Sequence, residues 1–161
     1  MRKWLMFLII GFCILEMTGC GMENATFVSD YNEALMKASE EKEVEIRYKE
    51  LFTFEWDDLY IFAPYTTKDT MEEIIGEKIN GNAVSVSDGE CIFIFCRNGR
   101  IETAIRSSEL ENTTVEYDTK QTYQQVEPEN FVEYSWEQDK TVLHMVIGEA
   151  NVKKTDNKTS E

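Results

Sequence analysis

Apolar residues follow three patterns along this chain. The first is an unbroken apolar run of 12 residues, 4–15, which Arg2 and Lys3 precede. A membrane-spanning helix needs roughly 20 apolar residues, so this shorter run fits the core of a secretory signal peptide. The positive charges before it hold the N-terminus inside while the rest of the chain is translocated. The other two patterns, helical spacing and alternation, occur farther along the chain.

Helical spacing occurs in two stretches. Apolar positions at intervals of three and four residues predict a helix over 29–41, with a capping serine or aspartate at its start. The sequence TTKDTMEEIIG, residues 66–76, predicts a short helix. We expect a capping pattern that begins at Thr70 and a stop at Gly76.

Alternation of apolar and polar residues predicts strands. Its clearest case is CIFIFCRNGRIETAIR, residues 91–106, where two alternating runs flank Asn98-Gly99. This dipeptide suits the type I′ turn of a β-hairpin. Further strands are predicted at 44–48, 52–56, 59–64 and 113–117, with a second hairpin over 131–148.

These elements predict an α+β fold in one domain. Hairpins dominate and no strand–helix–strand repeat is present, so we expect an antiparallel sheet of about five to seven strands with one or two helices packed on one face. The predicted organisation is a signal peptide over 1–19, a tether over 20–27, a single domain over 28–150 and a disordered tail over 151–161.

The strongest functional indication comes from a group of four residues that lies shortly after the apolar run. They are Met17, Thr18, Gly19 and Cys20, and they resemble the lipobox of bacterial lipoproteins, with methionine where leucine is commonest. The resemblance implies cleavage before Cys20, a lipid on its sulfur with fatty-acyl chains such as palmitate, and a place on the outer face of the cell membrane. Two acyl chains suffice for stable anchoring. The alternatives are a cleaved secretory signal with an incidental Cys20, or an uncleaved N-terminal anchor.

A second resemblance covers residues 54–76, FEWDDLYIFAPYTTKDTMEEIIG. This stretch is similar to a segment of small, uncharacterised lipoproteins of Gram-positive bacteria. They share its phenylalanine, its Trp-Asp pair, its Tyr-Ile-Phe strand, its Pro-Tyr-Thr loop and its acidic helix ending in glycine. The resemblance implies a setting beneath the cell wall and no particular activity.

Charge and cysteine content narrow the possible partners. The chain has 31 acidic and 16 basic residues, a net charge of −15, which argues against nucleic acid and against a domain lying flat on an anionic membrane. Cys91 and Cys96 lie five residues apart on a predicted strand, so their Cα atoms are about 16 Å apart and their side chains face opposite sides. We predict two buried free thiols; the alternative is a local disulfide that breaks the strand.

The candidate ligand or partner residues form two groups, Trp56-Asp57-Asp58 and Tyr65-Thr66-Thr67. Neighbouring strand residues face opposite sides, so the two aspartates act as an acid–base pair only if the strand bulges there. Otherwise Asp57 caps a turn, Trp56 fills the core and Asp58 is solvated. The second group precedes a helix N-terminus, where free N–H groups bind an anion unless a threonine caps them.

The remaining chemistry is sparse. The single histidine, His144, has no metal-ligand spacing around it and no nucleophile motif is present, so we expect neither metal nor cofactor. Most aromatic residues are expected in the core, and any exposed on a helix-free sheet face would mark a binding surface. The leading hypothesis is a non-catalytic, lipid-anchored extracytoplasmic lipoprotein that binds an unknown protein or small molecule. The alternatives are a small cell-envelope hydrolase with a carboxylate site, or a lipoprotein that assembles with or inhibits one protein.

Overall fold

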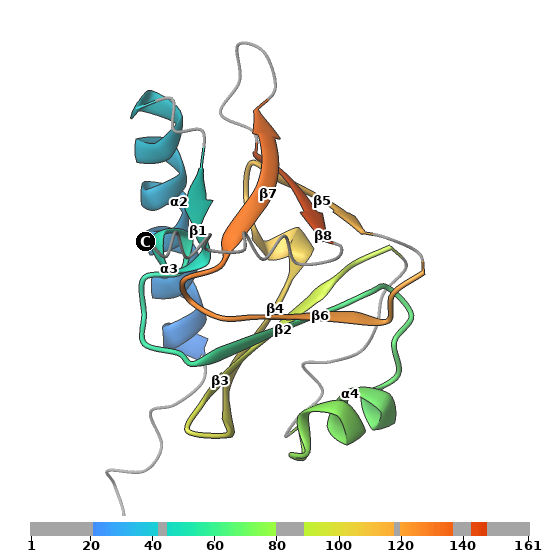
Figure 1. The fold of residues 1–161 in the computed structure, drawn as a ribbon. Helices are drawn as coiled ribbons and strands as arrows, with labels where there is room; N and C mark the ends of the chain where they lie inside the picture. Colours follow the sequence, from blue (N-terminus) through green and yellow to red (C-terminus); the bar gives the residue numbers. More distant parts are fainter. Residues whose placement is uncertain (1–20, 42–44, 80–88, 118–119, 137–142, 148–161) are drawn as a thin grey trace, which may run out of the picture.

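The computed structural model describes residues 21–41, 45–79, 89–117, 120–136 and 143–147 (Figure 1). The predictions for the signal peptide, for Cys20 and for the tail 151–161 lie outside these residues. The helices and strands are, in chain order, α2 (Gly21–Glu41), β1 (Ile46–Arg47), α3 (Tyr48–Leu51), β2 (Asp58–Phe62), α4 (Lys68–Ile75), β3 (Ile92–Arg97), β4 (Arg100–Arg106), η1 (Ser107–Glu109), β5 (Thr113–Tyr117), β6 (Tyr123–Val126), β7 (Phe131–Trp136) and β8 (Leu143–Ile147).

The strands form two sheets of four, in the orders β1-β7-β8-β5 and β4-β3-β2-β6. Neighbouring strands are antiparallel except β5 and β8, which run parallel. The α+β class is confirmed, and so are the second hairpin and an edge strand at 113–117. The single sheet of five to seven strands is replaced by two sheets, because strands distant in sequence pair in ways that alternation does not specify.

Strand β3 explains why both faces of the second sheet are covered. Phe93 and Phe95 belong to the larger apolar cluster, which the first sheet, α2 and α3 also supply. Ile92 and Ile94 point the other way, into a smaller cluster under α4. Five of the six residues of β3 are therefore buried, and its continuous apolar run reflects burial on both sides. The expectation of helices on one face only is wrong for this sheet.

The hairpin of β3 and β4 has the predicted turn. Arg97 and Arg100 pair across a loop of two residues. Those two residues, Asn98 and Gly99, have φ values of 52° and 70°. Positive φ at both positions is what a type I′ turn requires, and asparagine and glycine adopt it most readily. The turn sets the register next to the loop, where Cys96 pairs with Ile101, and the register then shifts between Cys96 and Phe95.

Helix α2 begins earlier than the sequence indicates. It starts at Gly21 rather than at Ser29, so residues 21–27, expected as a tether, are helical. Phe27 packs with the rings of Phe52, Phe54 and Phe95, at centroid distances of 5.6, 5.1 and 5.7 Å. Aromatic contacts of this kind stabilise a helix whose own amphipathic pattern is weak. The tether prediction is therefore wrong for the backbone of these residues.

The short helix α4 lies close to its predicted place, with a different cap. Its N-cap is Thr67, whose side chain accepts a hydrogen bond from the Thr70 amide at 3.3 Å, so Thr70 is not the cap. The helix ends at Gly76, as predicted, with a φ of 80°. Glycine adopts this left-handed conformation without a steric penalty.

Both expectations for Cys91 and Cys96 are confirmed. The two cysteines are free and buried, and they belong to the larger and the smaller cluster respectively, on opposite faces of the sheet. Burial raises the pKa of each thiol to about 11. Thiols in such surroundings are poor nucleophiles at neutral pH, because the reactive thiolate is scarce.

Candidate functional site

The first predicted group, Trp56-Asp57-Asp58, supports the fold. The Trp56 indole is buried and donates a hydrogen bond to the Phe52 carbonyl oxygen at 3.1 Å. The Asp57 carboxylate accepts a hydrogen bond from the Asn98 amide at 2.6 Å, and so caps the hairpin turn. Asp58 accepts one from the Gln125 side chain at 2.9 Å. The two carboxylates therefore have separate structural partners and do not face a common site.

The second predicted group, Tyr65-Thr66-Thr67, lies in a tight turn between β2 and α4. The buried Thr66 hydroxyl donates to the Ala63 carbonyl oxygen at 2.7 Å, and the Ala63 amide donates to the Thr122 carbonyl oxygen at 2.9 Å. Tyr65 has a φ of 68°, which a bulky side chain rarely adopts, and its side chain is 65% exposed. The turn thus holds an aromatic ring in solvent at a cost in backbone strain.

A surface hollow of about 540 Å³, which we call the Tyr65 hollow, adjoins this turn. Its lining residues come from the turn, the start of α4, the end of β5 and the segment before β6: Ala63, Pro64, Tyr65, Thr66, Thr67, Thr70, Tyr117, Gln121 and Thr122. None of these residues is charged, although 29% of the chain is. The hollow therefore offers hydroxyl, amide and aromatic groups without a net electrostatic preference.

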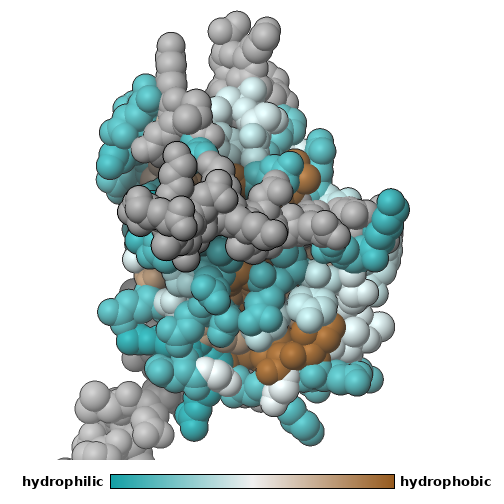
Figure 2. Space-filling model, viewed as in Figure 1, coloured by the Kyte–Doolittle hydropathy of each residue, from teal (hydrophilic) through white to brown (hydrophobic). Residues whose placement is uncertain are grey.

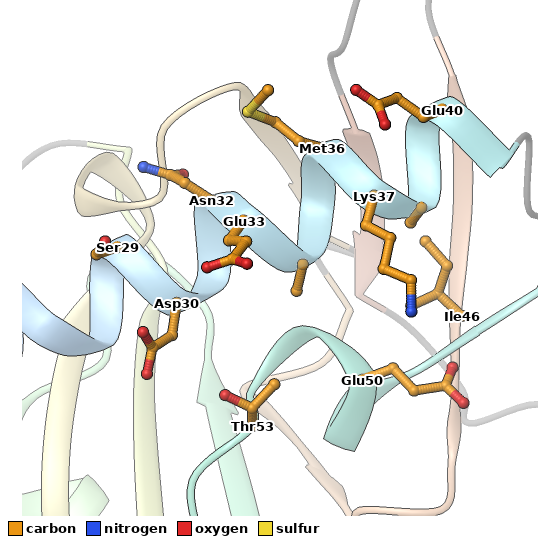
Figure 3. A pocket seen from close by; sticks show the side chains of 12 residues that line it. Ser29, Asp30, Asn32, Glu33, Met36, Lys37, Glu40, Ile46, Glu50 and Thr53 are labelled. Atoms are coloured by element: carbon orange, nitrogen blue, oxygen red, sulfur yellow. The ribbon is translucent and has the colours of Figure 1, made fainter.

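A second and larger depression, the α2 groove, runs along the exposed side of α2 (Figure 3). It has a volume of about 890 Å³, and its lining residues are Ser29, Asp30, Asn32, Glu33, Ala34, Met36, Lys37, Ala38, Glu40, Ile46, Glu50 and Thr53. Asp30, Glu33 and Lys37 extend from α2 on the side of α3, where Glu50 and Thr53 lie opposite (Figure 3). The groove thus lies beside the crossing of two helices.

Small side chains and carboxylates together give the groove its character. Ala34 and Ala38 leave space on α2, and the buried Ile46 lies beside them. Four carboxylates and one ammonium group line the groove. In the described part of the chain, no salt bridge involves Glu33 or Lys37. The charges of Glu33 and Lys37 are therefore available to a bound partner, whereas the Glu50 carboxylate pairs with Arg47 at 3.9 Å.

Comparisons with models of known protein families, with curated proteins and with solved structures find no match. The site therefore has to be interpreted from its own geometry. Sequence reasoning found the turn of the Tyr65 hollow but missed the rest of its lining. Tyr117 was predicted only as the end of a strand, and Gln121 and Thr122 lie in a segment that has no periodic pattern. It also missed the α2 groove. The indication in the sequence is the pair Ala34 and Ala38, four residues apart as in a helix, with Glu33 beside Ala34.

Other chemistry in the described residues is limited. His144 on β8 lies opposite Thr114 on β5 and Ser135 on β7. Among the residues that the structure describes, no three His, Cys, Asp or Glu side chains come together as a metal site would require. No helix within those residues is long and apolar enough to span a membrane.

The surface agrees with the acidic composition. The face in Figure 2 is largely hydrophilic, with an apolar area beside α4. The half-buried apolar residues that pack on the smaller cluster are Tyr60, Ile74, Ile75, Ile101 and Ala104. The aromatic residues at the centre of the larger cluster are Tyr31, Tyr48, Phe52, Trp56, Phe93 and Phe95. These aromatics form core and not an exposed platform, which agrees with the sequence-based expectation for most of them.

Proposed function

We propose that this chain is a lipid-anchored extracytoplasmic lipoprotein that binds a partner protein and has no catalytic role. The observation that carries the anchor is the sequence Met17-Thr18-Gly19-Cys20, which a single residue, Glu16, separates from the apolar run. Small residues before the cysteine give a transferase and a peptidase access to the backbone, and a thioether-linked diacylglyceryl group provides two chains for stable attachment. Helix α2 then begins at Gly21, the residue after the modified cysteine.

The anchor is tested by metabolic labelling with radioactive palmitate in a bacterium that processes lipoproteins. We expect the wild-type protein to carry label in the membrane fraction, and Cys20→Ala to lose the label and leave that fraction. Cys13→Ala is the matched control, because Cys13 lies within the apolar run and is expected to be removed with it. Equal labelling of Cys20→Ala and wild type would contradict the anchor.

The α2 groove supports a partner with a cationic segment. Its four carboxylates outnumber Lys37, and an alanine floor receives the aliphatic stem of a lysine or arginine while the charged end reaches a carboxylate. Asp30 and Glu40 are ten residues apart on one helix, which is about 15 Å along its axis. An extended segment of about five residues covers this distance. The groove is thus long enough for an extended peptide segment that carries basic residues.

Fluorescence anisotropy of the full-length protein in nanodiscs, with a peptide of alternating lysine and alanine, tests this surface. Removing two carboxylates with Glu33→Gln/Glu40→Gln is expected to weaken binding about fivefold, the range for exposed charge pairs. Lys37→Gln removes a repulsive charge and is expected to tighten binding about twofold. Glu73→Gln removes an exposed carboxylate on α4, away from the groove, and serves as the control.

The outcomes separate local recognition from general attraction to an acidic protein. Binding through the groove requires that Glu33→Gln/Glu40→Gln lose affinity while Glu73→Gln keeps it. If all variants bind alike, or if a peptide of alternating glutamate and alanine binds as well, the groove is not a site for cations. Labelling at Cys20 is measured separately, so the two parts of the proposal fail independently. No observation favours the hydrolase, because Asp57 and Asp58 are occupied within the fold.

A further inference from the structure

The Tyr65 hollow differs from the α2 groove in its charge. The groove is lined by five charged residues, whereas none of the described residues that line the hollow is charged. Its polar groups are threonine and tyrosine hydroxyls and the Gln121 amide. Each hydroxyl can donate and accept a hydrogen bond, and the amide has both a donor and an acceptor atom. Such a lining favours a neutral ligand rich in hydroxyl groups, because an ionic ligand would lose hydration without gaining a counter-charge.

The Tyr65 ring is exposed although its backbone has a positive φ. Its 65% exposure means that the side chain gains little from packing in the free protein. The residue nevertheless has a φ of 68°, in a left-handed region that a bulky side chain rarely adopts. A glycine would adopt the same φ without strain, so folding alone does not explain a tyrosine here.

The turn around Tyr65 is held from both sides. Pro64 and Thr66 are buried, and the Thr66 hydroxyl and amide both donate to the Ala63 carbonyl oxygen, at 2.7 and 3.3 Å. Thr122 accepts the Ala63 amide and so ties the turn to the segment before β6. The ring is thus presented on a preorganised backbone, which lowers the entropic cost of binding. A rigid tyrosine gives a large amphipathic contact surface with few rotatable bonds.

From these features we infer that the Tyr65 hollow binds a neutral saccharide, whose apolar ring face lies on Tyr65 and whose hydroxyl groups meet the polar lining. Exposed Tyr65 provides the contact face, and Tyr117 and Thr122 add polar groups to the lining from outside the turn. The N-terminus of α4 is capped by Thr67, so the inference does not depend on anion binding there. This site is separate from the α2 groove and from the proposed lipid anchor, so its test does not depend on either of them.

Saturation-transfer NMR on the full-length protein in nanodiscs tests the site, with cellotetraose, maltotetraose and tetra-N-acetylchitotetraose as probes. We expect transfer to at least one of these neutral oligosaccharides, unchanged between about 0.05 and about 0.5 M salt because no ion pair contributes. Tyr65→Gly is expected to reduce affinity at least tenfold, while its unfolding temperature equals or exceeds that of wild type, since glycine relieves the positive φ.

Tyr65→Phe keeps the ring and is expected to retain most of the binding. Tyr123→Ala is the matched control, since Tyr123 is a partly exposed tyrosine that does not line the hollow. The inference is overturned if no neutral probe shows transfer, if Tyr65→Gly binds as wild type does, or if Tyr123→Ala loses as much affinity as Tyr65→Gly. A gain in stability together with a loss of binding in Tyr65→Gly is the specific signature of strain kept for recognition.

Discussion

Replacing Phe27 by alanine tests whether the start of α2 belongs to the folded domain. The sequence pattern places this residue in a tether, and the structure places it against three aromatic rings of the larger cluster. A tether residue would contribute nothing measurable to stability, since exposed substitutions stay within about 0.5 kcal/mol. The two descriptions therefore predict different unfolding free energies.

The expected magnitude follows from the partial burial of Phe27. A fully buried phenylalanine costs about 3–5 kcal/mol when replaced by alanine. Phe27 is only partly buried, but its ring contacts Phe52, Phe54 and Phe95, and each aromatic pair contributes about 0.5–1.5 kcal/mol beyond area burial. We expect Phe27→Ala to lower the free energy of unfolding by about 2–3 kcal/mol, and Phe27→Leu by roughly half of that.

Urea unfolding, followed by tryptophan fluorescence to which the buried Trp56 contributes, measures this loss. The Trp56 ring lies 5.5 Å from Phe95, in the same cluster, so its emission reports on the packing that Phe27 completes. Met36→Ala is the control on the same helix, because Met36 is 55% exposed and outside the core. A Phe27→Ala midpoint that matches the Met36→Ala midpoint would refute the packing of this part of α2 into the domain.

Four further predictions concern the thiols and the turns. Cys91 and Cys96 are expected to resist iodoacetamide at neutral pH and to react once urea unfolds the chain; labelling of the native protein would contradict their burial. Burial raises the pKa of both thiols from about 9 to about 11. The stability that the neutral thiols contribute is therefore complete below about pH 9 and is lost as the pH rises towards about 11. Urea titrations at several pH values measure this loss. Thr67→Ala is expected to cost about 1 kcal/mol through loss of the helix cap, with Thr67→Ser restoring it; equal stability of all three proteins would exclude the cap. Asp57→Ala is expected to cost about 1 kcal/mol because the Asn98 amide loses its carboxylate acceptor, and an unchanged unfolding midpoint would contradict that role.

Local patterns predicted local structure well in this chain. Asn98-Gly99 between two alternating runs predicted the β3–β4 hairpin, and the five-residue spacing of Cys91 and Cys96 predicted their opposite faces. Both rest on contacts between near neighbours in sequence. Pairings between distant segments were not predictable in this way, because alternation does not say which strand lies beside which. The parallel pair β5–β8 and the division into two sheets depend on such pairings.

The errors in the sequence-based prediction have the same origin. Residues 52–56 alternate as a strand does, yet they form a loop whose rings pack into the core. Strand β6 was missed because two of its four residues, YQQV, are glutamines and the sequence has no alternation there. Its partner is β2, which is distant in sequence. Only part of the lining of the Tyr65 hollow was predicted. Tyr65 lies in a recognisable loop, whereas Thr122 comes from a segment without a periodic pattern. A site built across two segments needs the tertiary fold before it can be seen.

The helical start of the domain bears on how the proposed anchor and the α2 groove would act together. Helix α2 contains 21 residues, about 31 Å in length, and Tyr31 and Leu35 fix it in the larger cluster. With a lipid on Cys20, the groove between Asp30 and Glu40 would lie about 14–29 Å along this helix from the point of attachment. A flexible tether would let the domain present any face to a partner, whereas a continuous helix limits the directions in which the groove can face. Membrane attachment would therefore orient the groove as well as concentrate it, and a partner in the same membrane would meet it at a restricted height.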